Sequence, residues 1–256
     1  MNTYLNLEEK INNAKSLDFG DIISQSIDLF KKVWLKGFLT ILFLMIGGFI
    51  IGFVFGLIGL APVNNLFYDG FDLESLLTFY SKNALYSIPQ TILVSTLTIA
   101  LVSAFYRICK QLVLGESESD DYFYFFKKEY FSKVFMLGLI YTGIATLAQL
   151  LFLIPYIYAI VPLSYFSIIF ANNPDLSESE IVKASFKLGN KKWLITFGTL
   201  FVTGILAMLG VLACVIGLLF TISIVYLPMF FIYKDVIGFE ENREIDQIGM
   251  RDDTNY

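Results

Sequence analysis

The sequence contains no histidine, which removes the commonest metal ligand and the usual general base of enzymes. Histidine-ligated zinc or iron centres are therefore excluded, as are nucleophilic sites of the Ser-His-Asp or Cys-His type. We expect no metal, no cofactor and no catalytic residue, and we interpret the protein as non-enzymatic. The two cysteines, Cys109 and Cys214, are expected to be unpaired packing residues.

Charge is also scarce, because 16% of the residues are charged and 56% are hydrophobic, whereas an average soluble domain is about 25% charged. A charge-free apolar run of about 18 or more residues is typical of a membrane-spanning helix. This composition excludes a soluble enzyme and a nucleic-acid-binding protein. Four runs without Asp, Glu, Lys or Arg cover more than half of the chain: 37–68, 83–106, 134–174 and 193–233.

The lengths of these runs predict how often the chain crosses a bilayer. A helix rises about 1.5 Å per residue and the hydrocarbon core is about 30 Å thick, so one crossing takes about 20 residues. The first two runs fit one crossing each, whereas a helix through either of the last two would be about 60 Å long. Each of these two is predicted to form a hairpin, with turns near Ile154 and between Gly210 and Gly217, which makes six spans.

The basic residues lead to the same count independently. Of 18 Lys and Arg residues, only Lys82 lies between the first two predicted spans. The others lie before Gly37, within 107–133, within 183–192, or after Tyr233. The positive-inside rule places those four segments in the cytoplasm. An even number of crossings must then separate them, and both termini are predicted to be cytoplasmic.

We therefore predict an all-α fold, a polytopic membrane helix bundle. Residues 1–36 form a cytoplasmic N-terminal segment with an amphipathic helix, residues 37–233 form the membrane domain, and residues 234–256 form a cytoplasmic acidic tail. Between the first two spans lies the only sizeable outer loop, with Asp72 as a possible helix cap. The spans are predicted at 37–60, 88–106, 134–153, 155–171, 193–211 and 214–233.

A basic and aromatic motif precedes the first, third and fifth spans, at 30–34, 126–130 and 186–193. Before the first copy, an amphipathic helix is predicted to start at Ser16 or Asp18. Before the third, Ser177 and Glu180 predict a capping box, and Gly189-Asn190 are expected to end that helix. The predicted architecture is three repeats of an interfacial helix plus a helical hairpin.

The motif is expected to anchor the chain at the membrane surface, because lysine binds anionic headgroups and aromatic rings favour the boundary. A site for specific lipids or for a partner protein is the alternative interpretation. The predicted interfacial anchors are Lys31, Lys32, Trp34, Lys127, Lys128, Lys191, Lys192 and Trp193.

Two segments of the sequence resemble a known kind of membrane domain. The first runs from Asp18-Phe19-Gly20-Asp21-Ile22-Ile23 through Lys31-Lys32, and the second runs from Leu176-Ser177 through Lys191-Lys192-Trp193. The arrangement resembles the multi-pass membrane domain of bacterial glycerophosphoryl diester phosphodiesterases and the YciC-like membrane proteins. In those phosphodiesterases the chemistry belongs to a separate soluble domain, which this sequence does not contain. The resemblance therefore implies a bacterial membrane domain and transfers no catalytic residue.

Small residues inside the predicted spans indicate helix packing. Gly48, Gly52 and Gly56 lie four residues apart and predict a smooth ridge that another helix can approach closely. Packing within the bundle is the favoured interpretation, and a homodimer seam is the alternative. The second span offers a further small-residue surface, formed by Ser95, Thr96, Ile99, Ala100, Ser103 and Ala104.

Pro162 and Pro228 occupy corresponding places in the fourth and sixth spans, and each can kink its helix. A kink that fits the bundle is favoured, although broken helices also form substrate sites in transporters. Gln149 in the third span is expected to form a structural hydrogen bond across the bundle. No carboxylate or amine lies within the four charge-free runs, which counts against ion-coupled transport.

Two classes of function fit these features. The first is a non-enzymatic bacterial inner-membrane protein that acts as a subunit, scaffold or assembly factor of a membrane complex. Its surroundings are the lipid bilayer, and its partner is another membrane protein or a second copy. The alternative is a small-solute or lipid permease whose path is lined by the kinked fourth and sixth spans. It predicts a cavity edged by Gln149, Tyr158, Ser164 and Tyr165.

Overall fold

The computed structural model describes residues 3–60, 87–116, 119–151 and 153–239. Within those ranges the chain forms helices and no strand, which confirms the all-α prediction. The predicted outer loop with Asp72 and nearly all of the predicted acidic tail lie outside the described residues.

Six helices in the described part of the chain are long and apolar enough to cross a membrane, as predicted. They are Phe19–Leu57, Ile88–Leu114, Lys128–Leu150, Ile154–Asn172, Trp193–Leu212 and Gly217–Val236.

The first of these helices, α2 (Phe19–Leu57), joins the predicted amphipathic helix and the first span into one element of 39 residues. Its N-terminus is capped as the sequence suggested, because Asp18 Oδ1 accepts a hydrogen bond of 2.9 Å from the Asp21 N–H. The second copy of the basic motif instead contains a single 3₁₀ turn at Tyr124–Phe126. The copies thus differ in local structure, and the predicted threefold repeat is not confirmed.

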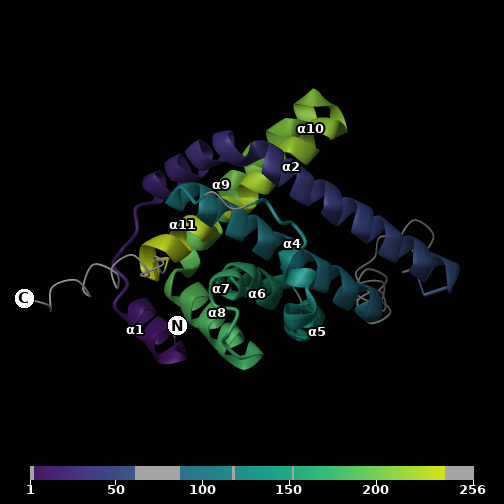
Figure 1. Ribbon diagram of the computed structural model, residues 1–256, viewed down its shortest axis with the longest axis horizontal. Coiled ribbons are helices and arrows are strands. Elements are labelled where there is room, and N and C mark those ends of the chain that lie inside the picture. The colour runs from purple at the N-terminus through teal and green to yellow at the C-terminus, as the bar shows by residue number, and fades with distance from the viewer. Residues whose placement is uncertain (1–2, 61–86, 117–118, 152, 240–256) are drawn as a thin grey trace, which may run out of the picture.

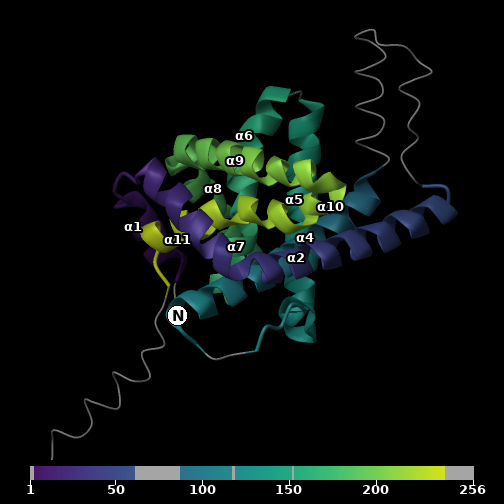
Figure 2. The same ribbon diagram turned by 90° about the horizontal axis from the view of Figure 1, so that it is seen from above.

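Helix α4 (Ile88–Leu114) lies at the centre of the fold, where it packs against α2, α5 (Lys128–Leu150) and α7 (Phe166–Asn172). Figures 1 and 2 show α5 running across α4 rather than along it. The crossing is close at Gly138, where an added Cβ would lie 2.9 Å from the Cα of Thr96. The small-residue surface predicted on this span is therefore buried by its neighbours.

Both predicted hairpin turns lie where the sequence suggested. Helix α5 ends at Leu150 and α6 (Leu153–Ser164) follows at once, close to Ile154. After α9 (Trp193–Met208), the chain turns through the 3₁₀ segment Leu209–Ala213 into α10 (Cys214–Thr221). This turn requires glycine, because a Cβ on Gly210 would lie 2.6 Å from the carbonyl oxygen of Gly217.

Helix α8 (Glu178–Lys191) begins with the predicted capping box. The Glu180 carboxylate accepts hydrogen bonds from the hydroxyl and the backbone N–H of Ser177, at 2.7 and 2.9 Å, and these bonds lower the pKa of Glu180. The predicted end at Gly189-Asn190 is wrong, because the helix continues to Lys191. Gly189 serves packing instead: an added Cβ would lie 2.7 Å from the Cα of Pro162 in α6.

Helix α1 (Tyr4–Asn12), which was not predicted from the sequence, packs against α8. The signal was present, since Leu7 and Ile11 lie one helical turn apart and are fully buried. The Glu8 carboxylate forms an ion pair with Lys187, and Lys191 Nζ donates to the carbonyl of Asn12 at 3.4 Å. Helix α1 is thus fixed to a helix that lies far away in the sequence.

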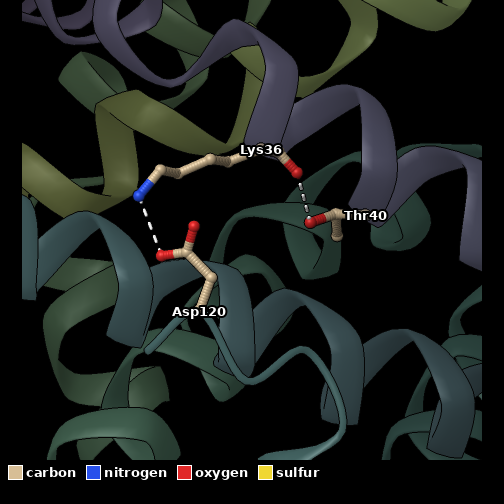
Figure 3. Close-up of polar contacts among 3 residues, drawn as sticks. All are labelled: Lys36, Thr40 and Asp120. Carbon is tan, nitrogen blue, oxygen red and sulfur yellow. Dashed lines mark hydrogen bonds and ion pairs between the residues drawn. The ribbon is translucent and has the colours of Figure 1, made fainter. Parts of the chain in front are cut away.

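Segments that the basic residues assign to one side of the membrane contact one another. Figure 3 shows Lys36 Nζ paired with the Asp120 carboxylate at 2.8 Å, while the Thr40 hydroxyl donates to the Lys36 carbonyl at 3.0 Å. Lys133 Nζ donates to the carbonyl of Pro174. Together with the pairing of α1 and α8, these contacts are those expected if an even number of crossings separates the segments.

The crossing of α4 and α5 gives a test with an internal control, because α5 contains two interior glycines. We expect Gly138→Ala to lower the free energy of unfolding by about 1–3 kcal/mol, since the new methyl group overpacks the contact with Thr96. Gly143 has no atom within 4 Å of an added Cβ among the described residues. Gly143→Ala should therefore be neutral or stabilise by up to about 1 kcal/mol. Unfolding in mixed detergent micelles measures both, and equal effects would contradict the crossing.

Candidate functional site

A cavity of about 360 Å³ lies where the fourth and sixth spans are interrupted. The fourth span breaks between α6 and α7, and the sixth consists of α10, the 3₁₀ segment Ile222–Tyr226 and α11 (Leu227–Val236). Residues from both interruptions line the cavity together with α4, α5 and α9. The lining consists of Val94, Ser95, Thr98, Ile99, Val102, Tyr141, Ile160, Leu163, Ser164, Ser167, Leu200, Val225, Tyr226 and Met229.

The break in the fourth span follows from Pro162, which has no N–H to donate to the carbonyl of Tyr158 one turn earlier. The indole Nε1 of Trp193 donates to that carbonyl instead, at 3.2 Å. Helix α6 then ends at Ser164, two residues after the proline. A side chain from the start of α9 thus satisfies the backbone group that the proline leaves without a partner.

Tyr165, at the break itself, is fixed by a hydrogen bond to α9. Its hydroxyl and that of Thr196 lie 2.6 Å apart, and both residues are fully buried. Thr196 donates its own proton to the carbonyl of Lys192, at 2.8 Å. Tyr165 is therefore the donor in this pair, since a threonine hydroxyl carries one proton.

The interruption in the sixth span lies just before Pro228, which occupies the first turn of α11. The Leu227 N–H donates to the Ile224 carbonyl, the group that the N–H of residue 228 would bond to in a regular helix. Helix α2 approaches this segment closely, because a Cβ on Gly37 would lie 2.2 Å from the hydroxyl oxygen of Ser223. Both predicted kink prolines are thus located next to the cavity.

Helix α4 holds the two broken spans in place through polar side chains one turn apart. The Ser103 hydroxyl donates to the carbonyl of Ser167 in the fourth span, at 2.9 Å. The Tyr106 hydroxyl donates to the carbonyl of Tyr226 in the sixth span, also at 2.9 Å. Both side chains are fully buried. The geometry of the cavity therefore depends on hydrogen bonds from one central helix.

The lining is largely apolar and contains no charged side chain among the described residues. Thr98 and Ser164 donate their hydroxyl protons to carbonyls of their own helices, those of Val94 and Val161, at 2.8 and 2.7 Å. The Ser95 hydroxyl oxygen accepts a hydrogen bond of 3.1 Å from Thr142. An environment of this kind favours an uncharged and mainly apolar molecule, because an unpaired charge there would lose its hydration.

Of the four residues predicted to edge a cavity, only Ser164 lines the one described. Gln149 is partly buried one residue before the end of α5. Tyr158 donates to the side chain of Asn190, and Tyr165 is bonded to Thr196. The contribution of α4 was not predicted from the sequence, although the small-residue surface expected there for helix packing includes Ser95 and Ile99. Nothing in the sequence pattern distinguished the lining residues Tyr141 and Tyr226.

The predicted glycine ridge on α2 is open in the described part of the structure. An added Cβ at Gly48 or Gly56 would meet no atom within 4 Å, and at Gly52 the nearest atom is Gln90 Nε2 at 3.6 Å. At Gly48 and Gly56 the described residues therefore supply no helix that packs on this ridge, whereas α4 reaches it at Gly52.

The predicted interfacial anchors divide into exposed side chains and side chains that bind other parts of the protein. Lys32 and Lys128 are exposed, as is Lys31, which pairs with Asp28 at 2.9 Å; Trp34 is 44% exposed. Lys127 lies 3.1 Å from the Asp121 carboxylate and 4.2 Å from the Tyr124 ring centre.

Lys192 differs from the other predicted anchors because it is only 7% exposed. Its ammonium donates to the carbonyl of Lys15, and burial, followed by the charge of Lys191, lowers its pKa. Trp193 stacks on Phe197 at 5.0 Å in addition to its bond to Tyr158. These two residues serve the internal structure around α8 and α9.

Comparisons of the chain with protein-family models, with curated proteins and with solved structures find no match. The geometry of the described residues is therefore the basis for inferring a role.

The bond between Trp193 and Tyr158 can be tested by a double-mutant cycle. We expect Trp193→Phe to lower the free energy of unfolding by about 0.5–1.5 kcal/mol, because the Tyr158 carbonyl loses its donor. The cost should fall in a Pro162→Ala background, where an alanine N–H can bond to the same carbonyl. Unfolding of the four variants in detergent measures the coupling. An equal cost in both backgrounds would contradict the role assigned to the indole.

Proposed function

We propose that the protein is a small-solute or lipid permease of a bacterial inner membrane, without enzymatic activity. The observation that supports this proposal is the cavity between the two interrupted spans. Interrupted helices near the bilayer midplane are a recurrent way to form a transported molecule's site. From the sequence alone, a permease with kinked fourth and sixth spans was the weaker alternative.

The chemistry of the cavity limits what such a permease would carry. Hydroxyl and apolar groups line it without a charged side chain among the described residues. An ion or a zwitterion would be desolvated there without compensation, whereas an uncharged molecule with a mainly apolar body would not. We therefore assign it an uncharged ligand and a passive mechanism that does not depend on a coupled ion.

The proposed location and orientation rest on the basic residues and on the resemblance to bacterial membrane domains. Seventeen of the 18 Lys and Arg residues lie in segments that the positive-inside rule places in the cytoplasm, with both termini. A cysteine at Asn172 should then be inaccessible to an impermeant maleimide added to intact cells. Labelling of that cysteine from outside would overturn the orientation.

Photolabelling with benzophenone, an uncharged and largely apolar ketone, tests whether the cavity takes up such a molecule. On irradiation of the full chain in lipid nanodiscs, we expect labelled peptides to come from α4 and the 3₁₀ segment Ile222–Tyr226. Ser164→Leu should reduce labelling at these sites at least about fivefold, because the larger side chain occupies the cavity. Peptide mass spectrometry quantifies the label.

The control for this experiment is Gly143→Leu, which adds the same side chain to α5 at a position where an added Cβ meets no atom within 4 Å. It should leave the labelling pattern unchanged. Labelling spread evenly over lipid-exposed helices, unaffected by Ser164→Leu, would contradict a cavity that binds uncharged molecules.

A second candidate function, a subunit or scaffold of a membrane complex, is favoured by the open glycine ridge of α2. At Gly48 and Gly56 the ridge meets no described residue of the chain itself, and large apolar side chains beside it are exposed, including Phe49 at 74% and Phe53 at 59%. A helix of another copy or of a different membrane protein could pack against it.

This second candidate predicts that the ridge controls association. Gly48→Leu combined with Gly56→Leu should convert an oligomer or a complex purified in mild detergent to the single chain, because the new side chains keep a second helix at a distance. Gly143→Leu, at another open glycine, should leave the assembly intact. Light scattering after size-exclusion chromatography measures the mass. A wild-type chain that always elutes alone would count against this function.

A further inference from the structure

The hydroxyl groups of two cavity tyrosines distinguish the cavity from the rest of the bundle. Buried tyrosine hydroxyls normally have a hydrogen-bond partner. Tyr106 donates to the Tyr226 carbonyl at 2.9 Å, Tyr165 bonds to Thr196 at 2.6 Å, and Tyr233 accepts a hydrogen bond of 2.8 Å from Asn173. These three lie elsewhere in the bundle, and each is fully buried.

Tyr141 and Tyr226 line the cavity, and the hydroxyl of neither has a hydrogen-bond partner among the described residues. Tyr141 comes from α5, and its ring packs edge-on against Phe166 at 5.8 Å. Tyr226 comes from the interruption in the sixth span, where its carbonyl, but not its hydroxyl, is bonded to Tyr106. Two polar groups without partners therefore belong to the surface of one largely apolar cavity.

The direction of the missing hydrogen bonds follows from the neighbouring hydroxyls. Thr98 and Ser164 donate their hydroxyl protons to the carbonyls of Val94 and Val161, so neither hydroxyl has a proton left to donate to a ligand. A phenol hydroxyl is a good donor and a weaker acceptor. The uncommitted donors of the two tyrosines therefore call for an acceptor oxygen on the ligand, and the lack of charge in the lining calls for that oxygen to be neutral.

We propose that the cavity recognises a ligand with an uncharged carbonyl group, as in a ketone or a carboxylic ester, through hydrogen bonds donated by Tyr141 and Tyr226. This inference rests on the proposed function and specifies the class of its ligand. Two sources carry the same chemistry: the ester carbonyl of a membrane lipid and the carbonyl of a free apolar solute.

A pair of probes of the same shape tests the role of the carbonyl. Benzophenone carries a C=O group, and 1,1-diphenylethylene carries a C=CH₂ group in its place. Equilibrium dialysis against the full chain in lipid nanodiscs measures both affinities, with empty nanodiscs as the blank for partitioning into lipid. We expect the ketone to bind about 10-fold more tightly than the alkene, the effect of one or two neutral hydrogen bonds.

The tyrosine variants assign this preference to the two hydroxyls. Tyr141→Phe and Tyr226→Phe should each weaken ketone binding about 3- to 10-fold and leave alkene binding unchanged, since only a hydroxyl is removed. Tyr165→Phe is the matched control: it removes a buried hydroxyl that is bonded to Thr196 and does not line the cavity. It should lower stability without changing the preference for the ketone.

The outcomes separate this inference from the proposed function. If benzophenone labels the cavity but binds no better than the alkene, or if both Phe variants keep the preference, carbonyl recognition is overturned while the cavity still binds uncharged molecules. If neither probe binds beyond the lipid blank, the proposed function fails as well.

Weaker ketone binding in nanodiscs of ester-linked lipids than in nanodiscs of ether-linked lipids would support recognition and identify the lipid ester as the natural source. Equal binding in both, with the preference intact, would support recognition of a free solute.

Discussion

The need to hydrogen-bond every backbone polar group in apolar surroundings governs this structure. Regular helices meet that need internally, but the fourth and sixth spans are interrupted and cannot do so alone. Side chains from other helices compensate, most clearly where the Trp193 indole bonds to the Tyr158 carbonyl that Pro162 leaves without its helical donor. Side chains of the surrounding helices bond to the interrupted backbone and so stabilise the interruptions. The cavity lies where these interruptions are.

The central helix carries much of this compensation. Ser103 and Tyr106 of α4 bond to the backbone of the two broken spans, and Thr96 on the same helix lies against Gly138 of α5. Small side chains let α5 approach closely, while hydroxyls on the same helix provide the bonds that irregular backbone requires. Close packing and hydrogen bonding are thus combined in one helix, which also lines the cavity.

Much of the fold could be predicted from the sequence because the bilayer imposes length and charge rules. Charge-free runs and the return of lysines after each pair of spans give six spans, and Asp18 and Ser177 identify helix starts. The prolines indicated where two spans would bend. The end of α8 was missed because Gly189, a frequent helix terminator, here meets Pro162 at close range, and tertiary packing decides such cases.

The cavity was less predictable than the helices. Its lining combines residues from five segments, and whether a serine or a tyrosine faces an open space depends on how helices cross, which periodicity does not encode. Ser164 was among the residues predicted to edge a path along the kinked spans, whereas Tyr141 and Tyr226 had no distinguishing neighbours in the sequence. Which lysines would be exposed anchors was also ambiguous from the sequence. Lys192 is buried against the carbonyl of Lys15, whereas Lys32 and Lys128 are exposed.

The packing of α1 on α8 has a consequence for biosynthesis. Glu8 and Lys187 are separated by 179 positions, so at a synthesis rate of about 5–20 residues per second α1 waits roughly 10–35 s for its binding partner. During that interval four spans leave the ribosome while Leu7 and Ile11 have no α8 to cover them. Helix α1, although synthesised before these spans, reaches its packed position only after α8 has been made.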